Sequence, residues 1–272
     1  MSDSMHRSPY YLPGQTARLL TAERVRECGN LGLLLDRYPP QRVMQEGRNR
    51  GTFRSRWLQE IASTFTIDAA LAEGAYRRWL NLTSAAGAQY FRAITNGRMA
   101  VGLGGETIMG TDLTLHALYG LPYIPGSALK GMTRAYVTSE VKDHRSKALS
   151  EDDALIRRIF GSQEVSGTVV FFDALPQSGR FVLALDIINP HYPRYYDEQQ
   201  PPTNDQRTNP FTFLTVTDTV FVFALATRRP VQAEARDDVM HAQQWLQEAL
   251  QEYGVGGKTS SGYGYFNPLP KE

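Results

Sequence analysis

The spacing of hydrophobic and polar residues changes about a third of the way along the chain. The first 85 residues are rich in arginine and contain few strand signals, and their pattern predicts helices at Thr16–Asp36, Phe53–Phe65 and Asp68–Leu80. From Gln89 onward, runs rich in Val, Ile, Phe and Leu predict strands. These strands are expected at Phe91–Val101, Thr168–Phe172, Phe181–Ile188 and Thr219–Ala226.

Two predicted helices are interleaved with these strands. One follows Pro125-Gly126-Ser127, and the other spans about Arg236–Tyr253. The second helix has two aspartates in its first turn and ends at Gly254, and one of its faces is apolar. That face consists of Val239, Ala242, Leu246, Ala249, Leu250 and Tyr253. The order of elements predicts an α+β fold with a ferredoxin-like, or RRM-like, βαββαβ sheet plus additions.

The chain is accordingly expected to divide into a helical, arginine-rich N-terminal region at 1–85 and a ferredoxin-like domain at 86–272. Within that domain, residues 189–210 contain five prolines and three tyrosines and show no periodicity. Loops of this length are usually functional or disordered. We therefore expect a long loop there, with a role that the sequence leaves open.

Composition excludes several classes of protein. No apolar run reaches the roughly 18 residues of a membrane helix, and the polar start lacks a signal-peptide stretch, so a cytoplasmic location is expected. Cys28 is the single cysteine, which rules out an intrachain disulfide and a cysteine-based zinc site. The net charge of +1 argues against indiscriminate binding to nucleic acid. Positive charge is instead concentrated at 41–56, where five arginines face one glutamate, a local charge of 5 − 1 = +4.

The segment from Tyr253 to Tyr265, YGVGGKTSSGYGY, carries the clearest chemical signal. Glycines let backbone N–H groups approach a phosphate, while lysine and hydroxyl groups add charge and donors. The segment differs from a nucleotide-binding P-loop, because Glu252 stands where that motif needs glycine and the segment follows a helix. The expected contacts to a sugar-phosphate backbone are Gly254, Gly256, Gly257, Lys258, Thr259, Ser260, Ser261, Gly262 and Tyr263.

A second anion site is expected where the helix after Pro125 begins. Ser127 is predicted to cap this helix and to leave backbone N–H groups and the positive end of the helix dipole for an anion. Lys130 and Arg134 are four residues apart and therefore share a face. A phosphate bound at the helix start would meet both charges.

Together these two segments resemble the RAMP superfamily of CRISPR-associated RNA-binding proteins, whose marks are an IPGS-x-LKG-x-x-R helix start and a C-terminal glycine-rich loop. Asn30–Tyr38, Phe171–Pro176 and Asn189–Tyr192 narrow the resemblance to the sixth-subunit family of type III-B Cmr effector complexes. The resemblance implies a non-catalytic backbone subunit. Its partners would be the guide crRNA toward its 3′ portion, the target RNA and the other Cmr subunits, without a cofactor, metal, membrane or small-molecule substrate.

Two alternatives stay open at this point. One is a CRISPR repeat-processing endoribonuclease using general acid–base chemistry, for which His191 is the best of five histidines, although none has a recognisable partner. Asp173 and Asp186 have no metal-binding spacing and are expected to satisfy backbone donors or pair with an arginine. The other is a scaffold that binds only protein, which leaves the glycine-rich segment and Lys130/Arg134 unexplained. Further expected RNA contacts are His191, Arg48, Arg50 and Arg54.

Overall fold

The computed structural model describes residues 9–44, 50–104, 113–139, 154–188, 210–228 and 234–270. Its main sheet has the strand order β2-β6-β1-β7, β3 also pairs with β6, and all of these pairs are antiparallel. The strands are β1 (Gln89–Asn96), β2 (Val169–Phe171), β3 (Leu175–Pro176), β6 (Val220–Thr227) and β7 (Tyr265–Pro268). With α7 (Gly126–Thr138) and α10 (Ala235–Glu252) as crossovers, the path β1–α7–β2–β6–α10–β7 has the βαββαβ order, and the α+β class is confirmed.

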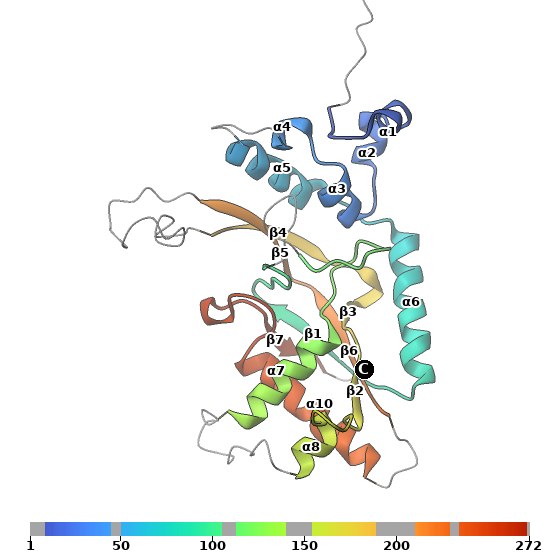
Figure 1. Cartoon of the computed structure of the whole chain (residues 1–272), viewed down its shortest axis with the longest axis vertical. Helices are drawn as coiled ribbons and strands as arrows, with labels where there is room; N and C mark the ends of the chain where they lie inside the picture. The colour runs from blue at the N-terminus through green and yellow to red at the C-terminus, as the bar shows by residue number, and fades with distance from the viewer. Residues whose placement is uncertain are drawn as a thin grey trace, which may run out of the picture.

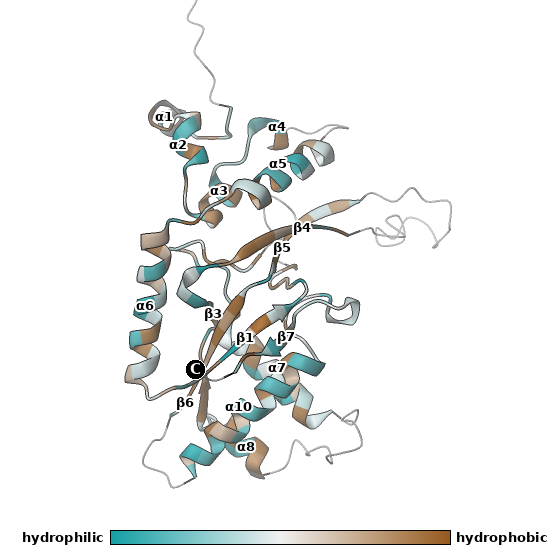
Figure 2. Cartoon of the chain, turned by 180° about the vertical axis from the view of Figure 1, so that it is seen from behind, coloured by the Kyte–Doolittle hydropathy of each residue, from teal (hydrophilic) through white to brown (hydrophobic). Residues whose placement is uncertain are grey.

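Helices α7, α8 (Ala154–Phe160) and α10 lie together on one side of this sheet (Figure 1). Phe91 and Phe223 are register partners on β1 and β6, and their rings stack with centroids 4.8 Å apart. Phe266 of β7 meets the Phe223 ring edge-on. The predicted apolar face of α10 is buried at Val239, Ala242, Leu246, Ala249 and Leu250. Figure 2 shows the hydrophobic colouring along β6, the strand at the centre of the core.

Residues expected to form a strand of the main sheet instead form a second sheet. β4 (Val182–Ile188) pairs only with β5 (Phe211–Thr217), a strand that the sequence pattern did not predict. The two sheets meet where Met99 and Val216 exchange backbone hydrogen bonds of 2.8 and 2.9 Å. β1 is also shorter than predicted, because the chain leaves the strand after Asn96 and turns at Gly97 with a φ of +82°. The 189–210 loop lies outside the described residues except for Pro210.

Most of the N-terminal helices lie at one end of the molecule, above the β4–β5 hairpin, whereas the last of them, Ala69–Ala85, runs beside the main sheet (Figure 1). The single helix predicted at 16–36 is wrong, because three short helices occupy this stretch. Thr21 and Asn30 are the N-caps of the second and third helices, because their side chains accept hydrogen bonds from Arg24 N and Leu33 N. These caps divide the stretch into separate helices. The helices are α1 (Gly14–Leu19), α2 (Ala22–Arg26), α3 (Leu31–Arg37), α4 (Gln41–Met44), α5 (Arg50–Thr64) and α6 (Ala69–Ala85).

An ion pair between the exposed Arg158 and the buried Asp238 ties α8 to α10. Asp238 is 1% exposed and accepts hydrogen bonds from Arg158 Nε at 3.0 Å and Nη2 at 2.7 Å. Thr168 Oγ1 donates a further bond of 2.9 Å to the same carboxylate. A buried carboxylate is tolerated only with such partners, so Arg158 and Thr168 hold the two helices against the start of β2. Over the described residues, no helix is long and apolar enough to cross a membrane.

Candidate nucleic-acid interface

The glycine-rich segment is a loop that packs against residues 98–103. Gly257 N donates to Ala100 O, and Gly264 N donates to Arg98 O, both at 2.8 Å. Glycine is required at Gly264, because its φ is +77° and a Cβ there would lie 2.0 Å from Val255 O. Val255 itself is 2% exposed, so its side chain anchors the loop in the core. Backbone hydrogen bonds and the close approach of Gly264 to Val255 therefore hold the base of the loop in place.

The tip of the loop has the geometry of an anion-binding nest. Lys258 adopts left-handed backbone angles, with φ 62° and ψ 30°, and a 3₁₀ turn at Thr259–Ser261 follows it. A left-handed residue followed by a right-handed turn forms a concave run of backbone N–H groups. The amides of Lys258, Thr259 and Ser260 donate no hydrogen bond to any residue that the structure describes. Three consecutive donors and the Lys258 ammonium group are thus available to a phosphate.

The predicted contacts in this loop differ in their access to solvent. Exposed positions are Gly256, Ser260, Ser261 and Gly262, and half-buried positions are Gly257, Lys258, Thr259 and Tyr263. Gly254 is buried, and its N–H donates to Ala249 O at 3.0 Å. Its function is to end α10 with a φ of +70°, so its inclusion among the phosphate contacts is corrected.

Asp186 joins the loop to the second sheet. Its carboxylate, on β4, accepts hydrogen bonds from the Tyr263 hydroxyl and from Arg98 Nη1, the latter at 2.6 Å. Burial alone would raise the pKa of Asp186, but bonds from Tyr263, Ile187 N and Arg98 outweigh it and lower the pKa below its usual value. Burial and the Asp186 carboxylate in turn raise the pKa of the Tyr263 hydroxyl. The expectation that Asp186 pairs with an arginine is confirmed.

The start of α7 is built differently from the prediction. The helix begins at Gly126 without a side-chain cap from its own segment, and Ser127 is exposed in its first turn. Gly126 N donates instead to Asp173 Oδ1 at 2.7 Å, so a carboxylate of this chain already occupies the positive end of the helix dipole. The Ser127 cap and the open anion site at this helix end are therefore wrong, whereas Asp173 satisfies a backbone donor as expected.

Lys130 and Arg134 belong to a basic cluster that also contains Arg228, which follows β6 and was not predicted. Burial lowers the pKa of Lys130, and the guanidinium groups of Arg228 and Arg134 lower it further. Like charges close enough to perturb one another favour a bound anion. The glycine-rich loop contacts residues 98–103, whereas the basic cluster consists of two residues of α7 and the residue that follows β6. The signal that could have identified Arg228 is its position directly after a buried strand.

The other predicted contacts are only partly described. Arg54 lies with its guanidinium carbon 3.6 Å from the centre of the Phe211 ring, and its Nη2 donates to Thr212 O. Arg54 thus fastens α5 to β5, and we correct its expected role as an RNA contact. Arg48 and His191 lie outside the described residues, as does the side chain of Arg50.

Two histidines lie in the described part of the chain, and neither is paired with a catalytic group there. His116 Nδ1 accepts a hydrogen bond from Leu118 N, and its ring stacks on Tyr119 with centroids 4.5 Å apart. Burial lowers the pKa of His116, although Asp173 raises it in part. His241 packs against Trp245 on α10. Within the same residues, no cluster of three or more His, Cys, Asp or Glu side chains could hold a metal.

Comparison with known proteins gives the following relationships. Residues 93–267 match the RAMP superfamily. The chain is 34% identical over 226 residues to CRISPR system Cmr subunit Cmr6 of Pyrococcus furiosus, a match that covers 62% of this chain and 65% of that protein. It is 29% identical to CRISPR system CMR subunit Cmr6 of Saccharolobus solfataricus, covering 65% and 56% respectively. The chain thus spans less than two thirds of either relative.

Among solved structures, a chain of type III-B Cmr-beta, determined by cryo-electron microscopy bound to cognate target RNA, aligns with a TM-score of 0.61 at 22% identity. That alignment covers 82% of this chain and 74% of the other. At such identity the likeness concerns the fold alone.

Proposed function

The chain belongs to the RAMP superfamily, and from this premise we propose that it is a non-catalytic RNA-binding backbone subunit of a type III-B CRISPR (Cmr) effector complex. It contacts the guide crRNA toward its 3′ portion and helps to present target RNA, in the cytoplasm. Its other partners are the remaining Cmr subunits. Its similarity to two Cmr6 proteins supports this assignment, and so does the fold that it shares with a chain of an RNA-bound Cmr complex.

The observation that carries the proposal is the nest at the tip of the glycine-rich loop. Three consecutive amides, at Lys258, Thr259 and Ser260, donate to no described residue, and a phosphate oxygen can accept from them without regard to base sequence. Ser260 and Ser261 are exposed and can add hydroxyl donors. A guide whose sequence varies has to be held in this way, through its sugar-phosphate backbone.

The basic cluster supports a second phosphate contact. Burial is the larger cause of the lowered pKa of Lys130, and a phosphate between Lys130, Arg134 and Arg228 would relieve the repulsion among the three cations that lowers it further. Phosphates of a single strand follow one another at short intervals, so an RNA can engage both the nest and the basic cluster with different nucleotides. Neither contact reads a base, and both act by charge and hydrogen bonding.

We expect the purified chain to leave both guide and target RNA uncut. A metal-independent ribonuclease has to place a base near the attacking 2′-hydroxyl, and His116 and His241 are engaged in packing or backbone hydrogen bonds. The measurement is a single-turnover assay on gel-purified RNA, run with and without EDTA. Specific cleavage by the chain alone would establish the endoribonuclease alternative, and loss of that cut in His191→Ala without loss of binding would assign the base.

Replacing Asp186 by asparagine should weaken RNA binding several-fold while the fold is retained. The substitution removes the charge that receives the Tyr263 and Arg98 bonds, and hydrogen bonds to charged groups are stronger than neutral ones, so the loop should lose about 1 kcal/mol of local stability. Asp218→Asn is the matched control, because Asp218 is exposed in the turn between β5 and β6.

Filter binding of RNA and hydrogen exchange at residues 258–264 provide the measurements. Because the pKa of Asp186 is lowered, its contribution is fully present above an unfolded-state value of about 3.9 and is lost as the pH falls through the lower folded value. The two variants should therefore differ across the whole neutral range. Equal effects of Asp186→Asn and Asp218→Asn on exchange and binding would show that Asp186 does not position the loop.

A further inference from the structure

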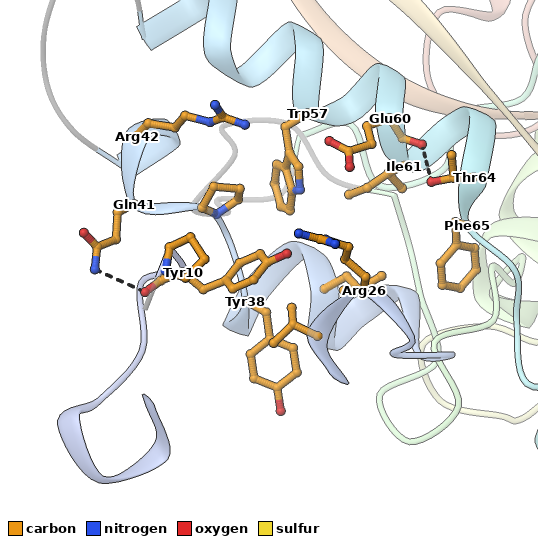
Figure 3. A pocket seen from close by; sticks show the side chains of 14 residues that line it. Tyr10, Arg26, Tyr38, Gln41, Arg42, Trp57, Glu60, Ile61, Thr64 and Phe65 are labelled. Carbon is orange, nitrogen blue, oxygen red and sulfur yellow. Dashed lines mark hydrogen bonds between the residues drawn. The ribbon is translucent and has the colours of Figure 1, made fainter. Parts of the chain in front are cut away.

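A cavity of about 700 Å³ lies among the N-terminal helices, away from the glycine-rich loop and the basic cluster. Its walls come from α2, α3 and α4 on one side and from α5 on the other. In Figure 3 the Trp57 side chain points from α5 toward Arg26 and Tyr10 across the cavity. The chemistry of the walls is set by Tyr10, Arg26, Tyr38, Arg42, Trp57 and Glu60.

The walls combine aromatic faces with positive charge. Trp57 is 8% exposed and therefore fixed, and the Tyr10 and Tyr38 rings, which also line the cavity, are half-buried. Arg26 and Arg42 are exposed at the edge, and none of the described residues forms an ion pair with either guanidinium. With Glu60 as the one acidic residue of the wall, the lining carries a charge of 2 − 1 = +1.

We propose that this cavity binds an unpaired RNA nucleotide, as a second RNA site besides the nest and the basic cluster. The base stacks on Trp57 or Tyr38, because aromatic side chains accept any base on their faces. The flanking phosphate is bound by Arg26 or Arg42. Glu60 is positioned to accept a hydrogen bond from an amino or imino group at the edge of the base. The inference rests on the proposed function, namely that the chain binds RNA.

Size and neighbouring charge favour a nucleotide over a segment of another protein. The volume falls within the range of pockets that enclose small ligands of nucleotide size. Arg26 and Arg42 are exposed at the edge of the cavity and give its lining a net positive charge, which favours an anionic strand. A purely apolar peptide groove would give no reason for two cations beside the rings.

The test uses crosslinking of a 4-thiouridine oligonucleotide to the full chain, with the attached peptides identified by mass spectrometry. We expect crosslinks at Tyr38 or Trp57 in addition to crosslinks in the glycine-rich loop. The double variant Arg26→Glu/Arg42→Glu should lower the yield at the cavity about tenfold and leave the yield at the loop within a few-fold. The matched control is Arg24→Glu/Arg37→Glu, which changes exposed arginines of α2 and α3 outside the cavity wall.

The proposal is supported if crosslinking at the cavity is lost in Arg26→Glu/Arg42→Glu and is unchanged in Arg24→Glu/Arg37→Glu. Crosslinks confined to the loop would overturn it while leaving the proposed function intact, and so would equal losses in the two double variants. Absence of any crosslink would overturn RNA binding by this chain, and this site with it. Circular dichroism of all variants confirms that each comparison is made between folded proteins.

Discussion

Replacing Gly264 by alanine is expected to abolish RNA retention and to lower the free energy of unfolding by about 3 kcal/mol. Two costs add at this position. The backbone angle, φ +77°, is one that side chains rarely adopt, and the new Cβ would lie 2.0 Å from Val255 O. Because Gly264 N also donates to Arg98 O, any shift that relieves the clash moves the loop off residues 98–103.

Gly262→Ala is the control that separates these two costs. Gly262 has a similar φ of +86°, yet a Cβ there would meet nothing within 4 Å. Only the conformational cost of about 1 kcal/mol applies, and RNA binding should stay within a few-fold of wild type. Thermal unfolding and RNA retention are measured for both variants. If Gly262→Ala and Gly264→Ala lose stability and binding equally, packing of the loop base is not what shapes the nest.

Much of the fold could be predicted from the sequence because its signals are local. The apolar face of α10 recurs at helical spacing, and Gly254 ends that helix, so both boundaries agree with the structure to within a residue or so. The α+β class followed from the alternation of predicted strands and helices. By contrast, Phe181–Ile188 has the composition of a central strand, and nothing local indicates that it pairs with residues 211–217 in a separate sheet.

The site was predictable in composition but not in contacts. Glycines with lysine and hydroxyl residues identified the loop, since this composition is needed for close backbone approach to a phosphate. The residues that hold the loop in place are Arg98 and Asp186. In the sequence they precede Tyr263 by 263 − 98 = 165 and 263 − 186 = 77 residues. Likewise, the side chain that accepts the hydrogen bond at the start of α7 belongs to Asp173 and not to Ser127, and Asp173 is 47 residues from Gly126 in the sequence. Such long-range pairings leave no periodic trace in the sequence.

Reversing the charge of Lys258 is expected to weaken RNA binding by about tenfold near physiological salt. Lys258 is the cation of the nest, and its glutamate variant both removes a phosphate contact and places a negative charge beside three unpartnered amides. The left-handed backbone at this position has a φ of 62°, which lysine already tolerates, so glutamate should leave the fold unchanged. Arg77→Glu, on the exposed side of α6, carries the same change in net charge and is the matched control.

The salt dependence of RNA affinity shows whether the glycine-rich loop binds phosphate. For wild type, the logarithm of the association constant with a single-stranded RNA should fall linearly with the logarithm of salt concentration, by about 0.7 per phosphate contact. Lys258→Glu should reduce that slope by about one contact, whereas Arg77→Glu should leave it unchanged. A protein-only scaffold would give no measurable RNA affinity. Either that result, or identical slopes for wild type and Lys258→Glu, would contradict phosphate binding by the glycine-rich loop.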